Sequence, residues 1–307
     1  MAKDLQIKSE QIYFAIPSAK KYHNQYFQNQ PAAFVNVSIT GTSCACNCEH
    51  CNAKLLNTML PVATPQRFHQ QVKLLKEQGC TGILISGGAN QEGRVPLKPV
   101  LEVIGETVAA GFQVVVHTGI LDYSTAVGLK NAGVHQVSMD IIGDITTIRQ
   151  VYHLDAKPED YLESMLICNE LALHFSPHVV IGLHFGQIKG EYRALEMIAQ
   201  TKPDNIVLVI LTPIKGTNMA DIQPPPLQDV SSVMEAAVKT AKNTPLTLGC
   251  ARPAGKYKRE LERKAVDLGF STIAYPDEST VNYCLEQGLQ PNFFEACCCL
   301  SPSTGKQ

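Results

Sequence analysis

The stretch SITGTSCACNCEHCNAKL, residues 38–55, places four cysteines within eight positions, directly after a short run of β-branched and apolar residues. Three of them, Cys44, Cys48 and Cys51, have the spacing C-x3-C-x2-C. The preceding run predicts a strand, so the cysteines fall on the loop at its C-terminal end. Parallel α/β barrels place their reacting groups on such loops. The stretch therefore predicts a barrel whose first loop binds a metal.

The rest of the chain alternates short β-branched runs with amphipathic segments, which is typical of a parallel α/β fold. The helix predicted from residue 65 has Thr64 as its N-cap and Pro65 at its first position. Strands are predicted at 33–40, 81–86, 112–118, 135–141, 178–185, 205–212, 246–250 and 271–275, and helices at 65–78, 97–110, 122–132, 158–173, 190–200, 227–242, 255–268 and 279–287.

Repeated crossovers without a reversal signal favour a barrel over an open doubly wound sheet. The predicted fold class is α/β: a parallel (β/α) barrel, full or partial, with a C-terminal cysteine-bearing extension. We expect an N-terminal extension at 1–30, the barrel domain at 31–288 and a cysteine-rich tail at 289–307. A chain of 307 residues is long enough to form one catalytic domain of this kind.

Composition excludes some classes of partner. The net charge is -2, only 18% of residues are charged, and there is no basic run. The chain therefore lacks the electrostatic footprint needed to bind nucleic acid or an anionic membrane surface. No window approaches the roughly 18 apolar residues of a membrane span, and the first residues lack the apolar core of a signal peptide. We expect a cytoplasmic protein.

Eleven cysteines are many for a cytosolic chain, where clustered thiols bind metal or do redox chemistry instead of forming disulfides. A structural zinc site needs four ligands, commonly from two C-x2-C-like pairs, and the chain shows no second pair at that spacing. Three thiolates instead suit a [4Fe-4S] cluster with one iron left for a non-protein ligand. Cys46 is interpreted as a loop thiol. Cys80, Cys168 and Cys284 are interpreted as small core residues.

On this motif the sequence resembles the radical S-adenosylmethionine (SAM) superfamily. The resemblance implies that Cys44, Cys48 and Cys51 hold the cluster and that SAM chelates its fourth iron. It also implies further SAM-binding residues at the ends of other strands. Gly87 and Gly88 in LISGGAN are two of them, and Ala89 there replaces the Glu of many members. The others are Ser138 and Asp140 at the end of the fourth strand, and Gly186 and Ile188 in GQIKGE, supported by Gly190. His117 is a weaker candidate, because it could equally be a hydrogen-bonded histidine at the barrel mouth.

A second group of cysteines lies late in the chain. Cys250 ends the seventh predicted strand, and Cys297, Cys298 and Cys299 follow the last helix in FFEACCCL. If the tail folds back across the barrel, Cys250 and some of the trio would hold an auxiliary [4Fe-4S] cluster. A subset is expected because successive side chains of an extended chain point to opposite sides. The alternative is a reactive or structural thiol patch.

A closer resemblance covers most of the chain. The segments SITGTSCACNCEHCNAKLLNTM, SGGANQEGRVPL, DIIGD, PIKGT and LGCARPAG, together with the late cysteines, are similar to the smaller subunit of two-component lipoyl synthase. This implies a sulfurtransferase in which a 5'-deoxyadenosyl radical removes hydrogen from carbon 6 or 8 of a protein-bound octanoyl chain, and the auxiliary cluster is sacrificed to provide the sulfur. Arg252, beside Cys250, could contact the substrate or form a surface salt bridge.

The same resemblance implies partners: a companion radical SAM subunit, an octanoylated lipoyl carrier domain, and an electron donor such as ferredoxin or flavodoxin. Two alternatives stay open on the residues alone. One is a radical SAM enzyme with another substrate, such as a biotin-synthase-like sulfur inserter. The other is a non-enzymatic Fe-S or zinc protein.

Overall fold

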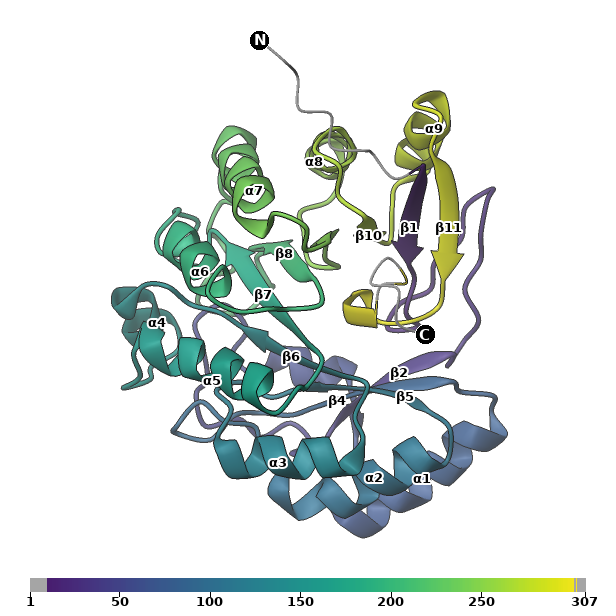
Figure 1. Cartoon of the computed structure of the whole chain (residues 1–307), viewed down its shortest axis with the longest axis vertical. Coiled ribbons are helices and arrows are strands. Elements are labelled where there is room, and N and C mark those ends of the chain that lie inside the picture. Colours follow the sequence, from purple (N-terminus) through teal and green to yellow (C-terminus); the bar gives the residue numbers. More distant parts are fainter. Residues whose placement is uncertain (1–9, 301, 303–307) are drawn as a thin grey trace.

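In a computed structural model that describes residues 10–300 and 302, eleven parallel strands form one curled sheet (Figure 1). The strand order is β11-β1-β10-β9-β8-β7-β6-β5-β4-β2-β3, so β3 and β11 are the two edges and the barrel is partial. Helices cover the outer face of the curl. The predicted parallel (β/α) barrel is confirmed in its partial form.

All eight predicted strands are present, and three more join them. The strands are β1 (Gln11–Ala15), β2 (Phe34–Ser38), β3 (Leu60–Pro61), β4 (Gly82–Ser86), β5 (Gln113–His117), β6 (Gln136–Asp140), β7 (Phe175–Ile181), β8 (Ile206–Ile210), β9 (Leu246–Leu248), β10 (Thr272–Ala274) and β11 (Gln290–Phe294). The strand predicted at 178–185 begins and ends earlier in the structure, at Phe175–Ile181. The strand ends at Ile181 because Gly182 has a φ of 81° and accepts a turn hydrogen bond from the Gly186 amide.

The eight predicted helices are also present, within a few residues at each end. They are α1 (Pro65–Glu77), α2 (Leu101–Ala109), α3 (Tyr123–Ala132), α5 (Pro158–Glu170), α6 (Glu191–Ile198), α7 (Leu227–Ala241), α8 (Lys256–Asp267) and α9 (Glu278–Glu286); α4 (Ile145–Val151) and the 3-10 segments η1 (Lys54–Thr58), η2 (Lys98–Val100) and η3 (Cys298–Leu300) were not predicted. Thr64 caps α1 as expected, since its side chain accepts from the Arg67 amide at 3.2 Å.

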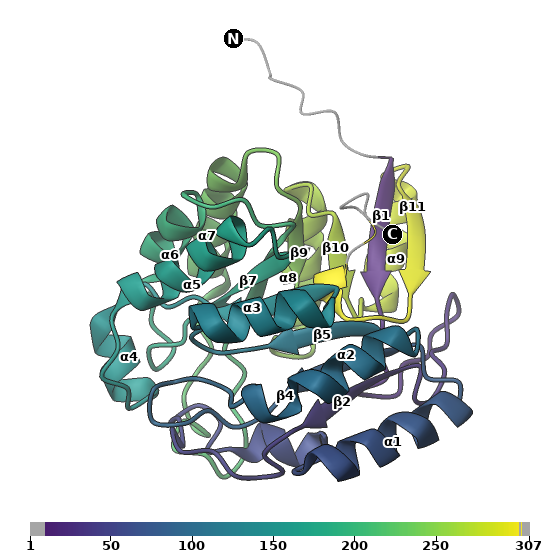
Figure 2. The ribbon, with the colours of Figure 1, turned by 60° about the horizontal axis from the view of Figure 1, so that its bottom comes forward.

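Strand β1, near the start of the described chain, and β11, near its end, lie side by side at one edge of the sheet (Figure 2). Strand β1 pairs in parallel with both β10 and β11. Strands β1 and β11 fall within the segments 1–30 and 289–307 that we predicted as extension and tail; both segments also include residues outside the described part. The domain boundaries remain a prediction, and the sheet now shows how the tail returns to the barrel.

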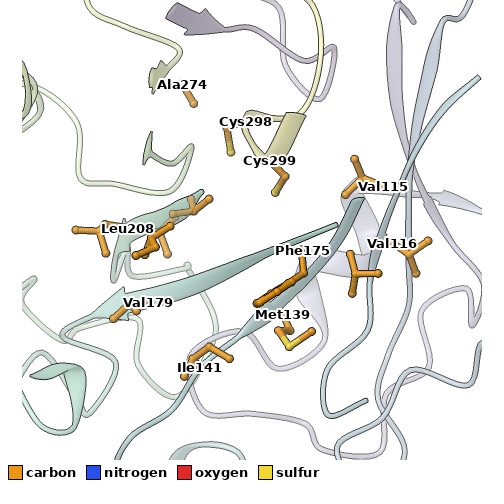
Figure 3. Packing of buried hydrophobic residues seen from close by; sticks show 14 of the residues in the cluster. Val115, Val116, Met139, Ile141, Phe175, Val179, Leu208, Ala274, Cys298 and Cys299 are labelled. Carbon is orange, nitrogen blue, oxygen red and sulfur yellow. The ribbon is translucent and has the colours of Figure 1, made fainter. Parts of the chain in front are cut away.

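Beyond β11 the chain turns into the concave side of the sheet. The η3 turn contacts β6 and β10 and lies within the curl (Figure 1). In Figure 3 the side chains of Cys298 and Cys299 project from this turn toward the strands. Buried polar groups at the N-terminal ends of the strands hold the turn: Asn205 Nδ2 donates to the Cys298 carbonyl at 3.2 Å, and Ser176 Oγ donates to the Cys299 carbonyl at 3.4 Å.

Arg252 forms a buried ion pair and not a surface salt bridge. Its side chain is 2% exposed, that of Glu262 is fully buried, and the guanidinium also donates to the carbonyls of Gly249 and Ala274. The other Glu262 oxygen accepts from the Asp277 amide at 2.8 Å. The pair therefore ties the loop after β9 to α8 and to the end of β10, beside Cys250.

No helix in the described residues is long and apolar enough to cross a bilayer.

Replacing Glu262 by Gln should lower the free energy of unfolding by about 3 to 5 kcal/mol, because it leaves the buried Arg252 cation without its counter-charge. Denaturant unfolding followed by circular dichroism measures the change. Glu260→Gln is the matched control on the same helix. Glu260 is half exposed and pairs with the exposed Lys256 at 3.4 Å, so its loss should cost less than about 1 kcal/mol. Equal effects of the two substitutions would contradict this account.

Candidate metal and cofactor centre

The cysteine loop follows β2 and is anchored on both sides by neighbouring loops. The Ala45 amide donates to the Ala89 carbonyl at 2.8 Å, next to β4. On the other side the His153 ring lies 3.1 Å from the Cys46 carbonyl and 2.9 Å from a Glu49 carboxylate oxygen. The loop is therefore held at the C-terminal edge of the sheet, where the sequence placed it.

Within the loop the thiols lie close together. The ligand atoms of Cys48, His50 and Cys51 are all within 4.8 Å of one another. Cys44 is half-buried, and its thiol contacts that of Cys46, which is 5% exposed and also contacts Cys48. The structure thus brings the predicted ligands Cys48 and Cys51 together and joins Cys44 to them through Cys46. His50 is an additional neighbour that the spacing of the cysteines did not reveal.

Hydrogen bonds between neighbouring thiols lower the pKa of one partner, whose thiolate accepts the bond, and raise the pKa of the other, which keeps its proton to donate it. A hydrogen bond from Cys48 lowers the pKa of Cys51 to about 4, and hydrogen bonds from Cys44 and Cys48 lower that of Cys46 to about 3. The same bonds raise the pKa of Cys44 and of Cys48. Of the three predicted ligands, only Cys51 has a lowered pKa. Thiolate is the form of cysteine that binds metal, so Cys44 and Cys48 would release their protons when a cluster binds. The donor set fits an iron-sulfur cluster.

Gly88 packs directly beneath the cysteine loop. A Cβ at Gly88 would lie 2.0 Å from the Ser43 carbonyl oxygen and 2.5 Å from the Cys44 Cα, so no side chain fits there. The Gly88 amide donates to Thr40 Oγ1 at 2.7 Å. Gly87, the other predicted SAM contact, lies against Thr40 as well. The glycine pair therefore brings the end of β4 next to the cysteines.

The polar residues predicted at the ends of β5 and β6 take part in two hydrogen-bonded pairs. His117 Nδ1 lies 3.1 Å from Ser138 Oγ, and Asp140 accepts from the Tyr152 hydroxyl at 3.3 Å. The Tyr152 ring packs on His50 at 5.2 Å between centroids, so Asp140 is linked to the cysteine loop. Tyr152 follows α4, and sequence analysis missed it together with that helix.

Gly186, Ile188 and Gly190 lie between β7 and α6, as the sequence predicted. Gly186 packs against the Gln223 carbonyl in the proline-rich loop, and Gly190 packs against Asp144. Ile188 is half-buried against the core. These contacts position the segment beside α4, and its predicted contact with adenine stays a prediction.

Three of the late cysteines line one cavity that opens to solvent. Cys250, Cys297 and Cys298 share this cavity of about 250 Å³ with Lys20 and Tyr275. Cys250 is exposed, Cys297 is half-buried and Cys298 is buried. Desolvation in the cavity raises the pKa of Cys250 and lowers the pKa of Lys20. The Lys20 ammonium lies 4.1 Å from the centroid of the Tyr275 ring, over its face. The cavity therefore combines thiols with one cation in a largely apolar setting.

The backbone of the trio differs from the extended chain that we assumed. Cys298 and Cys299 begin a 3-10 turn, and the Leu300 amide donates to the Cys297 carbonyl at 2.9 Å. In a turn, neighbouring side chains do not alternate across two faces. Cys299 Sγ consequently approaches His178 Nε2 to 3.6 Å, and the ligand atoms of His178, Cys298 and Cys299 lie within 4.8 Å of one another. Sequence analysis did not identify His178.

No protein-family model and no curated protein matches the chain. Solved structures do. HydG, a maturase of the [FeFe]-hydrogenase, superposes with a TM-score of 0.63 at 15% identity, over 92% of this chain and 65% of that one. Methylornithine synthase (PylB) gives 0.57 at 13% identity, over 92% and 84%. SuiB of Streptococcus suis, bound to S-adenosylmethionine, gives 0.56 at 11% identity, over 76% and 53%.

At these identities the likeness establishes the fold alone: the chain has a partial (β/α) barrel similar to those of HydG and PylB. The chain spans slightly less than two thirds of HydG and about half of SuiB. Reaction and substrate must therefore be argued from the side chains described above.

Replacing Gly88 by Ala should displace the cysteine loop, since the new Cβ overlaps backbone atoms and not a flexible side chain. If the loop holds one of two four-iron clusters, as the sequence predicts, reconstituted iron should fall by about half. Gly105→Ala is the control, because a Cβ at Gly105 meets nothing nearer than 3.7 Å. Iron and sulfide analysis after anaerobic reconstitution measures both variants. Full iron in Gly88→Ala would show that the loop tolerates the overlap.

Proposed function

We propose that the protein is a radical SAM enzyme in which Cys44, Cys48 and Cys51 hold a [4Fe-4S] cluster. The observation that carries the proposal is the position of this C-x3-C-x2-C loop, directly after β2 at the C-terminal edge of a partial barrel shared with radical SAM enzymes. When bound, the cluster and SAM supply a one-electron reductive cleavage that generates a 5'-deoxyadenosyl radical. SAM is the second cofactor in this proposal.

The chain's own residues would bind and orient SAM around that loop. Gly87 and Gly88 offer backbone groups next to Cys44, where no side chain intervenes. Ser138 and Asp140 offer polar atoms on β6, and His117 orients Ser138. We assign Gly186 and Ile188 to the adenine side of the site, on the segment after β7. The linked contacts from Asp140 through Tyr152 to His50 support one continuous site.

More specifically, we propose sulfur insertion into carbon 6 or 8 of a protein-bound octanoyl chain, the reaction of a lipoyl synthase subunit. Support comes from the late cysteines, because Cys250, Cys297 and Cys298 line one cavity of the same barrel that carries the first cysteine loop. An auxiliary [4Fe-4S] cluster held by a subset of Cys250, Cys297, Cys298 and Cys299 would place sulfide within the protein interior. A water-poor interior also protects radical chemistry.

The proposed partners follow from that reaction. One auxiliary cluster has sulfide for a limited number of insertions, so a companion radical SAM subunit is expected to provide the second sulfur. The substrate is an octanoylated lipoyl carrier domain, and a ferredoxin or flavodoxin provides the electron. We place the reaction in the cytoplasm.

Replacing Cys44, Cys48 and Cys51 together by Ala should abolish 5'-deoxyadenosine formation by the reduced protein, because the electron donor to SAM is lost. Chromatography of anaerobic reactions with SAM and dithionite measures it. Cys168→Ala is the control, since Cys168 is fully buried in α5, away from both cysteine groups. Continued 5'-deoxyadenosine formation by the triple variant would overturn the radical SAM proposal.

An octanoyl-lysyl peptide incubated anaerobically with SAM, reductant and this protein should gain one sulfur, and two when the companion subunit is added. Mass spectrometry of the peptide measures the gain. The double variant Cys250→Ala, Cys298→Ala should still cleave SAM yet add no sulfur, because the donor cluster is lost. No sulfur under any condition, with SAM cleavage intact, would point to another radical SAM substrate.

A further inference from the structure

Among the described residues, a second set of metal-ligating atoms includes a histidine that lies far from the cysteines in sequence. His178 belongs to β7, whereas Cys298 and Cys299 belong to η3, yet their ligand atoms lie within 4.8 Å of one another. Cys299 Sγ lies 3.6 Å from His178 Nε2. Cys298 and Cys299 are 6% and 2% exposed, so these groups meet inside the protein.

The histidine ring is oriented so that Nε2 faces the thiols. His178 Nδ1 lies 3.2 Å from the Ser176 carbonyl, which can only accept a hydrogen bond, so Nδ1 carries the proton. Nε2 is then left with a lone pair directed toward Cys299. Metal-binding histidines show this arrangement, in which the distal N–H is held by a carbonyl and the other nitrogen binds the metal. The His117 ring packs edge-on at 5.8 Å and restrains the imidazole.

The cysteine turn is fixed by the same strand end. Ser176 Oγ donates to the Cys299 carbonyl at 3.4 Å while the Ser176 carbonyl holds the histidine. Asn205, which is fully buried, donates to the Cys298 carbonyl at 3.2 Å. Ser176 therefore helps to fix both the imidazole of His178 and the turn that carries the thiols. Such support from neighbouring groups is what a ligand set needs in order to keep its geometry.

We infer that His178, through Nε2, is a ligand of the second metal centre together with Cys298 and Cys299, and that Cys250 or Cys297 completes the set. The inference rests on the proposed function only in naming the metal as iron in an iron-sulfur cluster. On binding, each of the three cysteine thiols in the set releases its proton to solvent, and the imidazole binds without losing one. A neutral imidazole in place of a thiolate makes the centre less negative, which raises its reduction potential relative to an all-cysteine cluster.

The test uses the full chain carrying Cys44→Ala, Cys48→Ala and Cys51→Ala, so that only the second centre is loaded, after anaerobic reconstitution with ferrous iron and sulfide. Pulsed electron paramagnetic resonance of the reduced protein should show nitrogen hyperfine coupling. Labelling the histidines with nitrogen-15 should replace the nitrogen-14 coupling by that of nitrogen-15. His178→Cys should keep the iron and lose the coupling. His69→Gln is the control, because His69 is a half-exposed histidine paired with Glu106, and it should keep both the iron and the coupling.

This experiment needs no substrate and no SAM, so it separates the ligand assignment from the proposed reaction. Nitrogen coupling together with failure of sulfur insertion would support the site and reject the lipoyl synthase proposal. A loaded cluster without nitrogen coupling, or coupling that survives His178→Cys, would overturn the assignment of His178. Absence of bound iron in the triple variant that otherwise keeps its circular dichroism spectrum would overturn the second centre itself.

Discussion

The pairing of β1 between β10 and β11 is the interaction on which the arrangement of the interior depends. Backbone hydrogen bonds join the two termini, from the Gln290 amide to the Glu10 carbonyl at 2.7 Å and from the Ile16 amide to the Phe294 carbonyl at 2.9 Å. Phe293 packs on Phe14 at 5.1 Å and stacks on Phe27 at 4.9 Å. These contacts direct the chain after β11 into the curl, and only then can the last cysteines meet Cys250 and His178.

The two ends of the barrel carry different tasks. At the C-terminal edge, close backbone packing beneath the cysteine loop fixes a group of thiols that are buried or half-buried. Near the N-terminal ends of the strands, buried hydrogen-bonding groups such as Ser176 and Asn205 fix a turn that carries thiols inward. A substrate acted on by both centres must reach the interior between them, so the curled sheet sets the geometry of the proposed reaction.

The sequence predicted most of the repeating structure and the first cysteine group, because both depend on local patterns: hydrophobic period, helix caps and ligand spacing. It missed what depends on long-range pairing. Strand β1 becomes recognisable only beside β10 and β11, and α4 is a short helix that brings Tyr152 to the cysteine loop. His178 lies within an ordinary strand pattern, and nothing local to it indicates Cys299. The alternation argument for the late trio failed because it assumed extended backbone, whereas Cys298 and Cys299 form a 3-10 turn.

The central claim is that one partial barrel holds two iron-sulfur centres. Iron and acid-labile sulfide analysis of the anaerobically reconstituted full chain, with Mössbauer spectroscopy to identify the cluster type, tests it most directly. The account predicts about eight irons and eight sulfides per chain, all in [4Fe-4S] clusters. About four irons, assigned by spectroscopy to a single cluster with an open iron site, would contradict the second centre and leave the late cysteines without a metal.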